Sequence, residues 1–66
     1  MYTLQDFLNT LTHAGSLIYI TNNGNYLYKG KHIEILEIDD FEKYYGYHVW
    51  RIDIYEDKYL WVNISK

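Results

Sequence analysis

The sequence predicts an α+β fold in which an N-terminal helix packs on one face of a curled antiparallel sheet of four or five strands. The first residues carry apolar side chains at helical spacing. The rest of the chain holds two pairs of segments in which apolar and polar residues alternate, and an Asn-Gly dipeptide separates the first pair. With 66 residues, we expect residues 1–66 to form a single small domain.

The predicted helix has one apolar stripe, formed by Leu4, Phe7, Leu8 and Leu11. Thr3 stands at the N-cap position, and Asp6 three residues later completes a capping box. Tyr2 precedes the cap, where it is placed to pack on Phe7 as a hydrophobic staple. Gly15 is the expected end of the helix because glycine readily adopts the left-handed conformation.

A β-hairpin follows, in which LIYITN and NYLYKG flank the turn Asn23-Gly24. A two-residue turn sets the register to four pairs: Asn22 with Asn25, Thr21 with Tyr26, Ile20 with Leu27, and Tyr19 with Tyr28. Because opposed residues share a face, the apolar face is formed by Ile18, Ile20 and Leu27. The other face carries Tyr19, Tyr26 and Tyr28.

The middle of the chain, residues 31–46, allows two interpretations. A short β-branched run favours a strand over Ile33–Ile38, and a helical turn is the alternative. Asp39 and Glu42 form a second capping-box pattern, and Gly46 can stop a helix. We therefore expect a short second helix over Asp40–Tyr45.

The C-terminal part predicts a second hairpin from HVWRIDI and YLWVNI. Two pairs match the apolar faces of the two strands: Trp50 with Val62, and Ile52 with Leu60. This register needs a loop with an odd number of residues, Tyr55 to Asp57. It also places the Arg51 guanidinium opposite the Trp61 ring, where a cation–π contact can form.

Composition excludes several kinds of site. The chain has no cysteine, which removes disulfides and thiolate metal ligands. The three histidines lie far apart in the sequence, unlike zinc ligands, and are His13, His32 and His48. Ser16 and Ser65 lack a nucleophile motif, and Gly24 and Gly30 are too isolated to form a phosphate loop. We expect no catalytic residue, cofactor or metal.

Aromatic residues make up 20% of the chain and include nine tyrosines. If the helix covers one sheet face, the other carries what we call the predicted aromatic face: Tyr19, Tyr26, Tyr28, Val49, Arg51, Tyr59 and Trp61. Exposed aromatic patches commonly mark interfaces, and Tyr, Trp and Arg dominate binding hot spots. We expect this face to bind another protein or a second copy, with a homodimer favoured. The alternative is that the rings pack only on one another or on the middle segment.

A second expected contact surface is acidic. It is formed by Asp39, Asp40, Glu42, Glu56 and Asp57. Such carboxylates could mimic phosphates and occupy a basic channel, and the alternatives are a hydrolytic carboxylate pair or solvated loop acids. Nine acids outnumber six basic residues, which argues against nucleic-acid binding. No apolar run of about 20 residues and no secretory signal are present, so we expect a cytoplasmic protein without a membrane partner.

The chain resembles accessory proteins of phages and mobile elements of AT-rich Gram-positive bacteria. The resemblance is carried by the helix TLQDFLNTL and the strand pairs LIYITNNGNYLYKG and HVWRIDIYEDKYLWVNI, in a very small, acidic, Tyr- and Ile-rich chain. Some proteins of that kind, anti-CRISPR proteins among them, block host defence. The resemblance implies an inhibitor that occludes a host protein in the bacterial cytoplasm. The alternatives are an oligomeric nucleotide-binding sponge and a single-stranded nucleic-acid-binding module.

Overall fold

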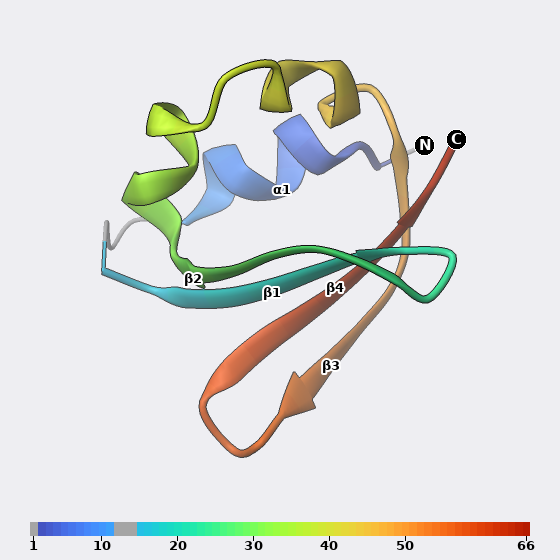
Figure 1. Ribbon diagram of the computed structural model, residues 1–66. Coiled ribbons are helices and arrows are strands. Elements are labelled where there is room, and N and C mark those ends of the chain that lie inside the picture. Colours follow the sequence, from blue (N-terminus) through green and yellow to red (C-terminus); the bar gives the residue numbers. More distant parts are fainter. Residues whose placement is uncertain (1, 12–14) are drawn as a thin grey trace.

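The computed structural model describes residues 2–11 and 15–66, and it confirms the α+β class. Its helix, strands and 3-10 helices are α1 (Leu4–Thr10), β1 (Leu17–Asn22), β2 (Asn25–Lys31), η1 (His32–Glu37), η2 (Phe41–Tyr44), β3 (His48–Tyr55) and β4 (Tyr59–Ser65). All three helical elements lie on one side of the sheet (Figure 1). The described residues therefore form two layers, and none of their helices lies on the opposite face of the sheet.

The sheet has four strands in the order β2-β1-β4-β3, and it is mixed, so the prediction of an antiparallel sheet is wrong. Each hairpin is antiparallel, but β1 and β4 run parallel at the centre. Alternation within a hairpin contains no information on how two hairpins meet. The pairing is set by contacts distant in sequence, such as the hydrogen bond from Thr21 Oγ1 to Asn63 Oδ1 at 2.8 Å.

The N-terminus of α1 is capped as predicted. The Thr3 hydroxyl accepts a hydrogen bond from the Asp6 amide, and the Thr3 amide donates to the Asp6 carboxylate, both at 3.2 Å. The Tyr2 and Phe7 rings meet edge to face with centroids 6.5 Å apart, which confirms the hydrophobic staple. These contacts fix how the chain enters the helix.

The end of α1 was predicted wrongly. The helix stops at Thr10, well before Gly15, because Leu11 has an extended backbone. The Leu11 amide donates to the Leu8 carbonyl at 3.2 Å and closes the last turn. A glycine is therefore not needed to end this helix.

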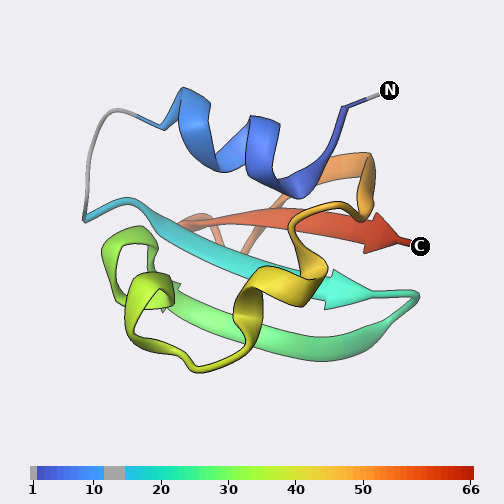
Figure 2. The ribbon, with the colours of Figure 1, turned by 90° about the horizontal axis from the view of Figure 1, so that it is seen from above.

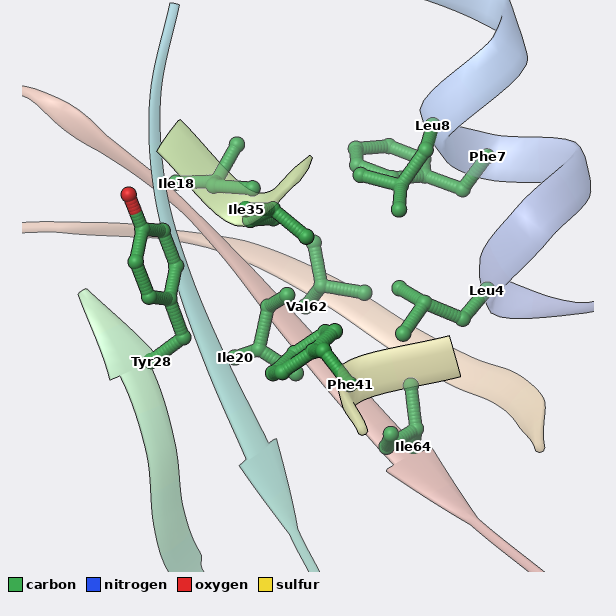
Figure 3. Packing of buried hydrophobic residues seen from close by; sticks show 10 residues of the cluster. All are labelled: Leu4, Phe7, Leu8, Ile18, Ile20, Tyr28, Ile35, Phe41, Val62 and Ile64. Atoms are coloured by element: carbon green, nitrogen blue, oxygen red, sulfur yellow. The ribbon is translucent and has the colours of Figure 1, made fainter. Parts of the chain in front are cut away.

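The core lies between the central strands and the helical layer (Figure 3). Its side chains come from every element except β3, and they are Leu4, Phe7, Leu8, Ile18, Ile20, Tyr28, Ile35, Phe41, Val62 and Ile64. Tyr28 and Phe41 pack edge to face with centroids 6.2 Å apart. The Tyr28 hydroxyl donates to the Lys31 carbonyl at 2.6 Å, which satisfies its one polar group.

A β-bulge changes the first hairpin. The pairs Asn22–Asn25 and Thr21–Tyr26 form as predicted, but Ile20 then pairs with Tyr28 and Leu27 becomes the extra residue. An extra residue moves all following side chains of its strand to the other face. Tyr28 therefore points into the core, and its predicted place on the aromatic face is wrong.

The middle segment forms two short 3-10 helices rather than a strand over Ile33–Ile38. Ile35 is buried in the core while Ile33 and Ile38 are exposed. A 3-10 helix has three residues per turn, so burial of Ile35 alone among these isoleucines fits a helical turn. In a half-buried strand, Ile33 and Ile35 would lie on the same face and would be buried together. The second predicted helix is confirmed as η2, although Asp40 at its N-cap makes no side-chain cap.

The second hairpin has the predicted odd loop, displaced by one residue. Tyr55 pairs with Tyr59, so the loop is formed by Glu56, Asp57 and Lys58. Glu56 and Asp57 adopt left-handed backbone angles, with φ of 53° and 58°. The predicted strand pairs are wrong, and the observed ones include Arg51 with Asn63, Ile52 with Val62, Asp53 with Trp61, and Ile54 with Leu60.

A bulge at Trp50 changes the start of β3. Val49 pairs with Ile64 and packs against the core, so its predicted place on the aromatic face is wrong. Arg51 lies beyond the bulge and keeps its predicted face. It does not oppose Trp61, and its Nε donates to the Asp53 carboxylate at 2.6 Å.

Candidate binding surface on the open sheet face

The candidate site is the sheet face opposite the helices, which we call the open face. Its residues alternate along the strands with the buried core residues. They are Tyr19, Thr21, Tyr26, Lys29, Arg51, Asp53, Tyr55, Tyr59, Trp61 and Asn63. All four strands contribute, and the helical elements lie on the other side (Figure 2).

Strand register arranges these side chains in two rows across the sheet. One row runs from Lys29 on β2 through Tyr19 on β1 and Trp61 on β4 to Asp53 on β3. The next row is Tyr26, Thr21, Asn63 and Arg51. Residues directly opposed on neighbouring strands lie about 5 Å apart, so each row places its side chains next to one another.

Four rings form a cluster in the middle of the open face. Tyr19 stacks on Trp61 with centroids 5.5 Å apart and lies 4.6 Å from Tyr55. Tyr55 also contacts Trp61 and Tyr59, at 5.7 and 6.2 Å. All four rings are half-buried, so each packs on its neighbours and still presents part of its surface to a partner.

A lysine bridges this cluster. The Lys29 ammonium lies 5.9, 5.6 and 5.6 Å from the ring centroids of Tyr19, Tyr55 and Tyr59. Lys58 lies 5.6 Å from the Tyr59 ring. These distances are within the range of cation–π attraction. The contacts hold the lysine stem across the rings and add positive charge to an otherwise apolar cluster.

Trp61 is oriented by a buried polar chain. Its indole Nε1 donates to the Thr21 hydroxyl at 3.1 Å, and that hydroxyl donates to Asn63 Oδ1 at 2.8 Å. Thr21 and Asn63 are both buried. Because buried polar groups need partners, this chain holds the indole in one orientation on the open face.

No protein-family model, curated protein or solved structure matches this chain.

The predicted aromatic face is therefore only partly assembled. The structure brings Tyr19, Tyr26, Arg51, Tyr59 and Trp61 together on the open face, while Tyr28 and Val49 face the core.

Sequence reasoning missed Tyr55 and Lys29. The sequence places Tyr55 in the loop because the predicted register sets Ile52 opposite Leu60, whereas Ile52 pairs with Val62, two residues further along β4. Lys29 reaches the rings only because the bulge at Leu27 turns it towards the open face. A signal for Tyr55 was present in the alternation of β3, which continues to this residue.

The predicted acidic surface is not one surface. Asp39, Asp40 and Glu42 lie around η2 on the helical side. Glu56 and Asp57 lie in the β3–β4 loop, at the far end of the molecule (Figure 1). The structure therefore has two small, exposed acidic groups, and each group would contact a partner separately.

The helical side carries a cavity of about 220 Å³, lined by Gln5, Leu8, Asn9, His32, Ile35 and Tyr45. Nδ1 of His32 is buried without a hydrogen-bond partner in the described part of the chain. His48 lies on β3, and His13 is outside the described residues. Within residues 2–11 and 15–66, no three metal-binding side chains converge, and no helix is long and apolar enough to cross a bilayer.

Proposed function

We propose that this chain is a non-catalytic protein-binding module whose open face contacts another protein. The observation that carries the proposal is that a whole sheet face, uncovered by helices, presents clustered rings beside Lys29 and Arg51. Tyr26 is 63% exposed at the rim of the cluster. Tyr, Trp and Arg are the residues that most often carry binding energy at protein interfaces.

The packing of the rings supports this role. A side chain that is already held in one rotamer loses less entropy on binding. Tyr19 and Trp61 are held by stacking, and Trp61 also by its hydrogen bond to Thr21. The open face is therefore a preorganised surface, which a partner can cover without ordering it first.

The resemblance to phage and mobile-element proteins extends the proposal. We infer that the partner is a host protein in the bacterial cytoplasm, and that the chain inhibits it by occluding a functional surface. The two acidic groups lie at opposite ends of the molecule and do not form one continuous acidic surface (Figure 1). Occlusion by the open face is thus preferred to mimicry of nucleic acid.

A second candidate function is single-strand nucleic-acid binding, favoured by the Lys29 ammonium among tyrosine rings on an open sheet. Against it, Arg51 is paired with Asp53, and Glu56 and Asp57 flank the cluster. These acids offset the positive charge that such binders need. Steeply salt-dependent binding of an oligonucleotide would favour this alternative, and heat stabilisation by added nucleotides would favour a nucleotide sponge.

The proposal is tested by capture from a lysate of an AT-rich Gram-positive host, followed by mass spectrometry. Tyr26→Ala removes an exposed ring from the open face, and Ile33→Ala is the control because Ile33 is exposed on η1 at the helical side. The amount of a true partner that is captured should be unchanged with the control variant. It should fall about tenfold or more with Tyr26→Ala or Trp61→Ala. Unchanged capture by both open-face variants would show that this face is not the binding site.

A further inference from the structure

The outer edge of β3 is a free pairing edge. β3 is the last strand of the sheet. The N-terminal segment covers only its beginning, where the Val49 amide donates to the Tyr2 carbonyl at 2.8 Å and Thr3 forms a bridge with His48. From Trp50 to Ile54, no other strand of the described chain lies beside this edge. An uncovered edge is a template for another strand.

The free edge also carries exposed apolar side chains. Trp50, Ile52 and Ile54 are 56%, 45% and 62% exposed. Ile52 and Ile54 pair with Val62 and Leu60, so they lie on the helical side of the sheet. The core stops short of them, which leaves an apolar strip beside unpaired backbone groups.

We infer that this edge pairs with a second copy of the chain. The β3 strands run antiparallel about a two-fold axis at Ile52, giving one continuous sheet with four strands from each copy. This inference stands on the edge and does not depend on the proposed function of the open face.

The side chains select this register. If the second copy were shifted by one residue in either direction, Ile52 would oppose Arg51 or Asp53 of that copy, and an apolar side chain would face a charged one. Among the remaining registers, an axis at Arg51 or Asp53 would oppose like charges, which is destabilising. An axis at Ile52 opposes Arg51 to Asp53 of the second copy, twice by symmetry.

The same register also matches the apolar strip. Ile52 opposes its own copy, and Ile54 lies beside the exposed, bulged Trp50 of the second copy. The strand is therefore complementary to itself in charge and in apolar surface, as an isologous interface requires. Charge complementarity is what identifies the occupant as a second copy rather than another protein.

Cysteine cross-linking tests the register, since the chain has no cysteine of its own. Ile52→Cys places two thiols opposite each other at the axis, within disulfide reach. Ile54→Cys is the matched control, because its two copies would lie about 14 Å apart along the strands. We expect rapid cross-linking of the first variant at tens of micromolar and at least tenfold less of the second. Equal cross-linking of both would overturn the register.

A charge-swap cycle tests the pairing without cysteine. Arg51→Asp and Asp53→Arg each create like charges across the axis, and the double swap restores opposite charges. In sedimentation experiments, we expect each single change to raise the dimer dissociation constant several-fold. We expect the double change to restore the dissociation constant of the parent. A double variant no better than the singles would contradict the pairing.

The apolar strip is tested by Ile52→Lys, with Ile33→Lys as control because Ile33 is equally exposed, at 46%, on η1. We expect Ile52→Lys to raise the dimer dissociation constant at least tenfold and the control to leave it unchanged. Circular dichroism confirms that each variant is folded. A parent chain that stays monomeric at 100 micromolar would refute the inference, as would a dimer broken by Tyr26→Ala and not by Ile52→Lys.

Discussion

Replacing Thr21 by valine is expected to destabilise the fold, because it removes the hydroxyl that joins β1 to β4. That hydroxyl donates to Asn63 Oδ1 and accepts from the Trp61 indole. Valine has nearly the same shape as threonine, so the change deletes two hydrogen bonds and leaves no cavity. The variant therefore isolates the energy of the polar chain under the open face.

The expected loss of stability in Thr21→Val follows from the burial of the two groups that the hydroxyl binds. Asn63 is only 7% exposed, so its carbonyl oxygen loses its partner inside the protein, at a cost of about 1–3 kcal/mol. Trp61 is half-buried, so its indole N–H regains water at little cost. In a domain of this size the sum corresponds to a fall in Tm of about 5–20 °C.

Thermal melting followed by circular dichroism measures the effect. Thr10→Val is the control, because the Thr10 hydroxyl bonds only the Phe7 carbonyl at the exposed end of α1, and its loss should cost under about 0.5 kcal/mol. Thr21→Ser keeps the hydroxyl and should melt above Thr21→Val. If Thr21→Val melts like the parent, the polar chain contributes nothing and Trp61 is held by stacking alone.

Three further changes probe the core. Leu8→Ala should cost about 2–5 kcal/mol in urea unfolding, because Leu8 is buried beneath α1. Burial, and then the Glu34 carboxylate, raises the pKa of Tyr28, so the stability that this group contributes is complete below about pH 10 and is lost as the pH rises beyond it. Tyr28→Phe should reduce the fall in Tm above pH 10. Gly30→Ala should cost about 1–3 kcal/mol by the same assay, because its Cβ would lie 2.8 Å from the Tyr28 hydroxyl oxygen, whereas Gly46→Ala has open space and should be neutral.

Features that depend on neighbours in sequence could be predicted. The capping box of Thr3 and Asp6 and the turn at Asn23-Gly24 involve residues within three positions of one another. Their geometry is set by local hydrogen bonding and backbone preference, which a sequence pattern records directly. The same reasoning assigned Trp61 to the face away from the helices, because alternation within a strand is also local.

Features that depend on distant contacts could not be predicted. The two bulges, at Leu27 and Trp50, follow no residue pattern that the hairpins display, yet each reverses the faces of the residues beside it. The bulges therefore account for the misplacement of Tyr28 and Val49. The parallel contact of β1 with β4 joins residues about 40 positions apart, and short-range alternation does not encode it.

The exposed edge of β3 lies beyond the reach of the helical layer in the described part of the chain. With 7 residues, α1 is about 10 Å long, while four strands span about 14 Å across the sheet. The 3-10 helices supply Ile35 and Phe41 to the core, and α1 supplies Leu4, Phe7 and Leu8. No element of the described chain covers Ile52 and Ile54, which are 45% and 62% exposed. A second copy completes the sheet without a longer chain, and the two-fold axis keeps both open faces on the same side. Dimerisation would therefore bring the two apolar strips side by side and join two open faces into one.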